Sequence, residues 1–149
     1  MAVSRAMRRL LRVLESQEEQ YRAALASALA NLKRLEGAMA ATAERDRAGR
    51  QLVADSARTG ELTDRLAGLE ETRTARRHAA GLTPKIAEAK LATTARQQEF
   101  LAKRIERRQA EMLIRKTEVE DNLEAGRRAQ QGLDDWFLRG VRRKAAERE

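Results

Sequence analysis

Apolar residues in the first third of the chain recur in alternating steps of four and three. They are Met7, Leu11, Leu14, Tyr21, Leu25, Ala28, Leu32, Leu35 and Met39, and Glu18 is the one polar residue in the series. Steps of this size keep an apolar stripe on one face of a helix and allow two helices to wrap around each other. The pattern predicts a long coiled-coil helix that begins near Ser4.

The stripe weakens between Gly37 and Gly60, where alanine, glycine and charged residues predominate. A second series then runs from Leu52 to Leu69, offset by three residues from the first. An offset of this kind locally overwinds a coiled coil without ending the helix. Because each interior glycine costs about 1 kcal/mol relative to alanine, we expect a continuous but soft helix here, bent or partly frayed.

The clearest helix-breaking signal lies at residues 79–84. Gly81 suits the left-handed residue that ends a helix, Thr83 suits an N-cap, and Pro84 suits the first turn of the next helix. The preceding arginines, Arg76 and Arg77, favour a helix C-terminus. The sequence therefore predicts one domain over residues 1–149, with a first helix over about 4–78, a turn over 79–83 and a second helix over about 84–144.

Two lines of apolar residues follow the predicted second helix. The line that we expect to face the first helix is Leu91, Leu101, Ile105, Met112, Val119, Leu133 and Trp136. The other line, off this seam, is Ile86, Phe100, Leu113, Ile114, Leu123 and Phe137. A two-helix hairpin covers one face of each helix, so part of the second line should remain exposed and available to a partner.

A short loop makes two long helices antiparallel neighbours. The predicted fold is therefore all-α, a long antiparallel two-helix coiled-coil hairpin whose termini meet at one end. Composition agrees, because 36% of the residues are charged and only 3% are aromatic, too few large side chains for a thick globular core. The net charge is +8. We expect the hairpin to join two basic clusters into one tip beside Trp136 and Phe137; the clusters are Arg5, Arg8, Arg9 and Arg12, and Arg139, Arg142, Arg143 and Lys144.

Candidate chemistry is sparse. The chain has no cysteine and a single histidine, His78, and it contains neither a phosphate-binding loop nor a nucleophile elbow. We expect no enzymatic activity, no catalytic residue, no cofactor and no metal. The basic tip is either incidental charge at helix ends or a surface that docks into an acidic socket of a protein. Trp136 and Phe137 would then be apolar anchors, unless one of them closes the hairpin as a clasp against Leu10, Leu11 or Leu14.

Nucleic acid and membrane are weaker candidates as partners. The clustered arginines resemble a nucleic-acid footprint, but zinc-finger and RNP patterns are missing and aromatics for base stacking are few. No apolar run reaches the roughly 20 residues that a bilayer span requires, and the chain start lacks the apolar core of a signal peptide. We expect a cytoplasmic protein that binds other proteins.

Three segments carry a family resemblance: residues 7–20 (MRRLLRVLESQEEQ), 104–113 (RIERRQAEML) and 133–139 (LDDWFLR). With the length and the hairpin layout, they resemble the FliJ/YscO family, the small stalk proteins of bacterial flagellar and virulence type III export systems. The turn containing Pro84 has no counterpart in this resemblance. It implies a protein similar in shape to the central stalk of a rotary ATPase.

Under this resemblance the basic tip would insert into a hexameric export ATPase. The remainder would reach the export gate, peripheral to a membrane-embedded machine, and bind secretion chaperones. The implied gate-facing residues lie near the predicted turn: Leu69, Arg76 and His78.

Two alternatives stay open. One is a self-associating scaffold in which the stripe over residues 11–39 pairs between chains, and the other is a basic nucleic-acid-binding rod whose affinity falls with salt. The breaker at Gly81 and Pro84 favours a monomeric hairpin over an uninterrupted parallel dimer.

Overall fold

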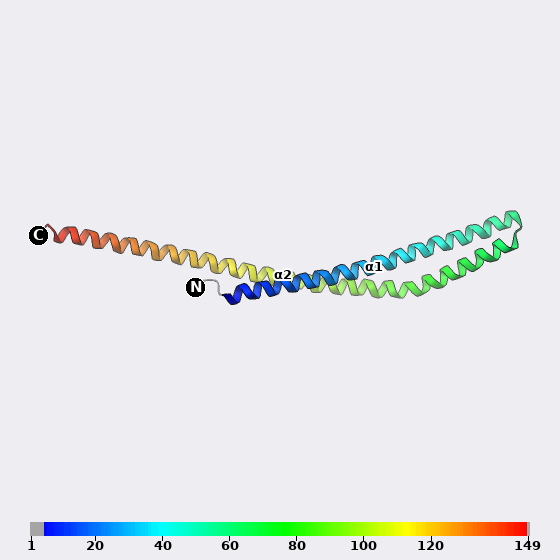
Figure 1. The fold of residues 1–149 in the computed structure, drawn as a ribbon, viewed down its shortest axis with the longest axis horizontal. Coiled ribbons are helices and arrows are strands. Elements are labelled where there is room, and N and C mark those ends of the chain that lie inside the picture. The colour runs from blue at the N-terminus through cyan, green and yellow to red at the C-terminus, as the bar shows by residue number, and fades with distance from the viewer. Residues whose placement is uncertain (1–4, 149) are drawn as a thin grey trace. The chain divides into compact units, whose positions relative to one another are not determined.

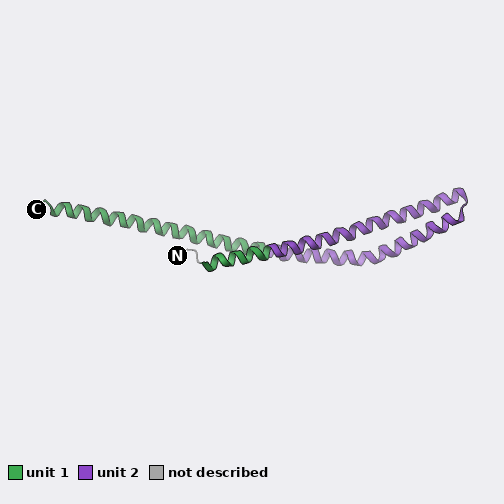
Figure 2. Ribbon diagram, in the orientation of Figure 1, with its two compact units in different colours: residues 1–18, 103–149 green, residues 19–102 purple. Residues whose placement is uncertain are grey.

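The computed structural model describes residues 5–148 as two α-helices joined by a tight turn (Figure 1). Helix α1 spans Arg5–Thr59 and helix α2 spans Leu62–Ala146. They pack against each other as a helical hairpin, which confirms the predicted all-α fold. Two compact units divide the chain (Figure 2): unit 2 comprises residues 19–102, and unit 1 comprises the described parts of residues 1–18 and 103–149.

The turn lies at Gly60 and Glu61. Gly60 has a φ of 75°, in the left-handed region, and its amide donates a hydrogen bond to the Ser56 carbonyl at 2.8 Å. Glycine commonly ends helices in this way because it has no side chain to clash. Asp64 then places an acidic side chain in the first turn of α2, where the helix dipole favours it.

The predicted turn at residues 79–83 is therefore wrong, because this segment lies inside α2. The hydroxyl of Thr83, the expected N-cap, instead donates to the Ala79 carbonyl at 2.9 Å within the helix. Pro84 is exposed, while Leu82 and Ala89 on the opposite side are buried. We attribute the continuity to this buried face, whose packing offsets the roughly 3 kcal/mol that an interior proline costs.

In unit 2 the α1 stripe keeps one phase as far as the turn. Beyond Met39 the same steps of four and three reach residues that are buried or partly buried, namely Thr42, Asp46, Gly49, Val53 and Ser56. The predicted three-residue offset is wrong, since Leu62, Leu66 and Leu69 of the offset series are exposed. Small and polar side chains continue the stripe where apolar ones stop, so the spacing of leucines does not reveal it.

Most of the facing positions on α2 in unit 2 are also small. Gly68, Ala75, Leu82 and Ala89 are buried at intervals of seven. A Cβ added to Gly68 would lie 2.6 Å from the carbonyl oxygen of Gly49. The two backbones touch here, and only glycine permits so close an approach. Further from the turn, the core widens around Leu35, Leu82 and Ala89, with Leu32, Met39 and Ile86 packed against them.

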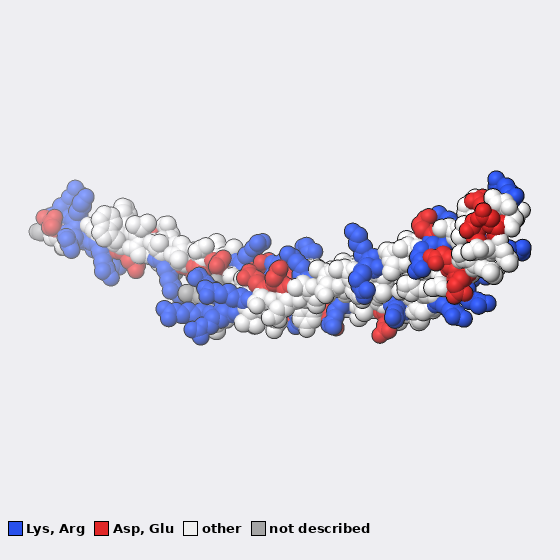
Figure 3. Space-filling view, turned by 45° about the vertical axis from the view of Figure 1, so that its right-hand side comes forward, with Lys and Arg blue, Asp and Glu red and all other residues white. Residues whose placement is uncertain are grey.

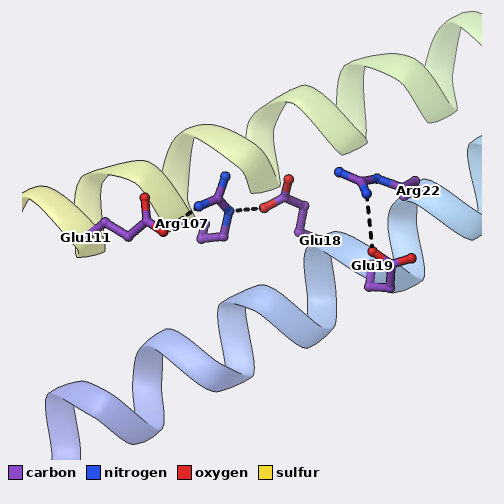
Figure 4. Close-up of polar contacts among 5 residues, drawn as sticks. All are labelled: Glu18, Glu19, Arg22, Arg107 and Glu111. Atoms are coloured by element: carbon purple, nitrogen blue, oxygen red, sulfur yellow. Dashed lines mark hydrogen bonds and ion pairs between the residues drawn. The ribbon is translucent and has the colours of Figure 1, made fainter.

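In unit 1 the polar interruption of the α1 stripe has a charged partner on α2. Glu18 is only 5% exposed, and Arg107 of α2 binds its carboxylate (Figure 4). Arg107 also binds Glu111, one turn further along α2, at 2.6 Å. The two carboxylates raise the pKa of Arg107, with the Glu18 hydrogen bond as the largest cause. A buried ion pair of this kind favours one alignment of the helices over others.

Three residues of the α2 line expected to lie off the seam face α1, and the other three, Leu113, Leu123 and Phe137, are exposed. Ile86, Phe100 and Ile114 are partly buried, whereas the residues expected in the seam are exposed: Leu91, Leu101, Ile105, Met112, Val119, Leu133 and Trp136. Alanine, threonine and charged residues complete the seam that α2 forms with α1. The line with the larger apolar residues was therefore wrongly predicted to face α1. We call the side of α2 turned away from α1 the outer face; its large apolar residues in unit 1 are Ile105, Met112, Val119, Leu123, Leu133, Trp136 and Phe137.

Helix α2 continues beyond the start of α1 within unit 1 (Figure 1). Arg5 lies thirteen residues before Glu18, and the residue thirteen after Arg107, the partner of Glu18, is Glu120. The start of α1 is therefore level with about Glu120. From residue 122 to residue 146 every residue of α2 is exposed, and we call this segment the α2 extension.

Candidate protein-docking surface

Over residues 5–148, no group of three or more histidine, cysteine, aspartate or glutamate side chains could hold a metal ion. The single histidine, His78, has Nδ1 3.4 Å from the hydroxyl of Thr42, which itself donates to the Ala38 carbonyl at 2.8 Å. His78 thus faces α1 and not an open cavity. Within the same residues, neither helix is long and apolar enough to cross a membrane.

The predicted basic tip is not formed. Arg5, Arg8, Arg9 and Arg12 occupy the first turns of α1. Arg139 lies nineteen residues beyond Glu120, so about 28 Å of helix separates the two clusters at 1.5 Å per residue. Figure 3 shows basic side chains gathered at the far end of α2 and, separately, around the start of α1. The cause is the early turn, which makes α2 85 residues long and α1 only 55.

Trp136 and Phe137 do not close the hairpin as a clasp. They are 74% and 64% exposed, and α1 begins too far back along α2 for Leu10, Leu11 or Leu14 to reach them. Both aromatics therefore remain available to a partner.

An open groove on the α2 extension combines these aromatics with part of the basic cluster. Its lining consists of Trp136, Phe137, Gly140, Val141, Arg143, Lys144 and Glu147. We call Trp136, Phe137, Gly140, Arg143 and Lys144 the terminal patch. Gly140 has open space where a Cβ would lie, so a shallow notch separates the aromatics from the basic residues one turn on. Tryptophan and arginine are the side chains most enriched in binding hot spots. Arg139 and Arg142 extend from other sides of the helix.

The structure brings together two of the three residues implied to face a gate. Leu69 and Arg76 line a shallow groove on α2, close to the turn, with Leu66 and Arg73. His78 is not part of this groove, because it lies toward Thr42.

Sequence reasoning missed an acidic groove on α2 ahead of the terminal patch. Its lining consists of Thr117, Glu120, Asp121, Leu123, Glu124 and Arg127, three acidic side chains with one basic one. The signal was present in the chain, because residues 117–126 contain four acidic side chains and no basic one. The net charge of +8 masks this local run of acidic residues.

These features define the class of the molecule: a two-helix antiparallel hairpin with exposed apolar and charged surfaces suited to protein contacts. Comparison of the chain with protein-family models, with curated protein sequences and with solved structures finds no match. The resemblance to the FliJ/YscO proteins therefore rests on its three sequence segments, and it enters below as a proposal.

Proposed function

We propose that this chain is a non-enzymatic stalk or adaptor of a type III protein export apparatus, which docks on a hexameric export ATPase and links it to the gate and to secretion chaperones. The observation that carries the proposal is the α2 extension, a helix with every residue exposed that ends in aromatic and basic side chains. Exposed apolar side chains grouped in this way mark a surface for a partner.

The form of unit 1 supports insertion of the extension into a ring. A single helix with its side chains is about 10–12 Å wide, narrow enough for a channel between subunits. Its basic end would be drawn to an acidic socket, which speeds association and sets orientation. The second basic cluster, Arg5 to Arg12, lies where α1 begins and the hairpin becomes two helices wide. In this arrangement it would meet the rim of the channel.

The groove of Leu69 and Arg76 lies in unit 2, near the turn, and is the proposed contact for the gate or a chaperone. The resemblance also implies a cytoplasmic position, peripheral to a membrane-embedded machine.

The test measures binding to the export ATPase encoded in the same genome, and its turnover. Changing Trp136 and Phe137 to alanine should weaken binding by at least roughly tenfold, since hot-spot aromatics contribute about 2 kcal/mol or more each. Leu91→Ala is the matched control, because Leu91 is an equally exposed residue of α2 in unit 2. Equal binding by the double variant and the control, or no binding by the unaltered chain, would refute the proposal.

The packing of the stripe over residues 11–39 argues against the alternative of self-association through this stripe. Leu35 in this stripe is buried against Leu82 and Ala89 of the same chain, and Leu32 and Met39 pack beside it. The stripe is already covered within the hairpin, so a second copy would have to use another surface.

A further inference from the structure

The end of α2 has an apolar stripe that nothing in the described chain covers. Its residues follow the spacing i, i+3, i+4, i+7 and i+8: Leu133, Trp136, Phe137, Gly140 and Val141. In a folded domain this spacing marks the side of a helix that packs on a core. Here the four large side chains are between 51% and 74% exposed, and helix α1 begins further back, level with about Glu120. The stripe therefore has the pattern of a buried helix face but lies in solvent.

Arginines occupy the other side of the same turns. They follow the spacing i, i+3 and i+4 and so share one side of the helix: Arg139, Arg142 and Arg143. At 3.6 residues per turn, Arg139 lies about 160° around the helix from both Phe137 and Val141. Apolar and basic side chains are thus separated, with Trp136 at the boundary, one turn before Arg139.

The segment that carries both sides has charge of one sign. Residues 136–146 have a net charge of +4, from four basic residues and no acidic one. Acidic residues lie at its two ends: Asp134 and Asp135 precede it, and Glu147 follows the helix. The Asp134 carboxylate accepts a hydrogen bond from the Gln130 side chain at 3.1 Å. Positive charge therefore surrounds most of the stripe.

We propose that residues 133–146 bind the surface of a bilayer that contains anionic phospholipids, with the helix lying along the surface and the apolar stripe turned toward the acyl chains. Helices that combine aromatic and aliphatic residues on one side with arginine and lysine on the other bind membrane interfaces in this way. Tryptophan is enriched at the level of the headgroups, which is the level that Trp136 takes at the edge of the stripe.

The basic residues act at different depths. Arg143 lies on the same flank as Trp136, two turns further along, and reaches lipid phosphates directly. Lys144 lies within the stripe in the last turn of α2, and its flexible stem carries the ammonium group up to the headgroups. Arg139 and Arg142 point away from the acyl chains but stay within about 10 Å of the surface, roughly one Debye length. All four basic residues thus favour anionic over neutral lipid.

The width of the stripe favours a bilayer over a partner helix. From Trp136 to Val141 it spans about 140° of the helix circumference at 3.6 residues per turn. A coiled-coil partner covers a narrower seam, so it would leave one edge of the stripe in water. A fluid surface covers the whole stripe.

Four large apolar side chains make a small anchor, so the binding is weak, reversible and dependent on anionic lipid. This inference does not rest on the proposed function, because no other protein takes part. A bilayer and an ATPase would compete for Trp136 and Phe137.

The first experiment uses Trp136, the only tryptophan of the chain. Its fluorescence is measured while the full chain is titrated with vesicles of phosphatidylcholine and phosphatidylglycerol, and with vesicles of phosphatidylcholine alone. With the mixed vesicles we expect a shift to shorter wavelength and quenching by brominated acyl chains, and with the neutral vesicles at least roughly tenfold weaker binding. Unchanged emission with the mixed vesicles would overturn the proposal, even if the chain sedimented with them through another surface. Equal binding to both vesicles would overturn it as well.

The second experiment places a charge in the stripe. Val141→Asp should abolish the fluorescence shift, because a carboxylate would have to enter the apolar part of the bilayer. Leu91→Asp is the matched control, since Leu91 is an exposed apolar residue of α2 in unit 2, and it should leave the shift unchanged. Equal behaviour of the two variants would contradict the proposal.

The third experiment removes the arginines. Changing Arg139, Arg142 and Arg143 together to glutamine should weaken binding to the mixed vesicles about 100-fold, or about fivefold for each basic residue near an anionic surface. The control removes the same charge from three exposed arginines of unit 2: Arg65, Arg73 and Arg77. All six residues are exposed, so the packing of the hairpin is retained in both variants. An equal loss of binding in both would show an effect of net charge alone and overturn the assignment.

Discussion

Replacing Gly68 with alanine should destabilise the hairpin, although alanine is the better helix former. An added Cβ would lie 2.6 Å from the Gly49 carbonyl oxygen and 2.9 Å from Cγ2 of Val53. Ordinary contact begins at 3.4 Å, so the two backbones would have to separate by about 0.8 Å. Overpacking of this kind typically costs about 1–3 kcal/mol.

Gly81→Ala provides the matched control. Gly81 is also an interior residue of α2, but it is exposed and has nothing within 4 Å of an added Cβ. Both variants gain the same helix propensity, about 1 kcal/mol. The difference between them therefore isolates the steric cost at Gly68, and we expect Gly68→Ala to be less stable by about 1–3 kcal/mol.

The assay is urea unfolding followed by far-ultraviolet circular dichroism, with the two variants compared under identical conditions. In thermal unfolding the same difference corresponds to about 2–4 °C per kcal/mol for a chain of this size. The comparison also locates the turn. If the chain turned at residues 79–83, Gly81 would be left-handed and its replacement would destabilise, while Gly68→Ala would stabilise an open helix. That reversed order would refute the hairpin register described above.

Two further predictions concern ion pairs. Glu18→Gln should lower the free energy of unfolding by about 1–3 kcal/mol, less than the roughly 3–5 kcal/mol of a fully buried pair, because Arg107 keeps its contact with Glu111. The control is Glu19→Gln, which should cost less than about 0.5 kcal/mol because the Glu19 side chain is 71% exposed. Equal losses of stability in urea unfolding would contradict this prediction. Arg45 donates a hydrogen bond to Glu71 at 2.6 Å and thereby lowers the pKa of the Glu71 carboxyl group. Because the folded pKa lies below the unfolded one, this stabilisation is present above the unfolded pKa and is lost as the pH falls through the folded pKa. Arg45→Gln should therefore be less sensitive to acid in this range than the unaltered chain, and an unchanged pH profile would argue against the pair.

The separation of the two basic clusters makes each testable alone. The cluster at the start of α1 and the cluster near the end of α2 would have acted together at one tip, but they occupy different levels of unit 1. Substitutions in one cluster should therefore change the affinity for the partner differently from substitutions in the other cluster.

The sequence by itself determined that the chain is helical, that it folds back once and that the first helix has its stripe from Met7 to Met39. These properties follow from local chemistry. Helix-forming residues and regular apolar steps act within a few turns, and neighbouring residues are enough to reveal them.

Tertiary structure alone decided where the chain turns and which face of α2 meets α1. Gly81, Thr83 and Pro84 are the stronger local breakers, yet Gly60 forms the turn. A local breaker costs only a few kcal/mol, whereas the turn position sets the alignment of every layer along the seam. The alignment that places Gly49 against Gly68 and Arg107 against Glu18 satisfies small and charged residues, and their fit is invisible until both helices are present.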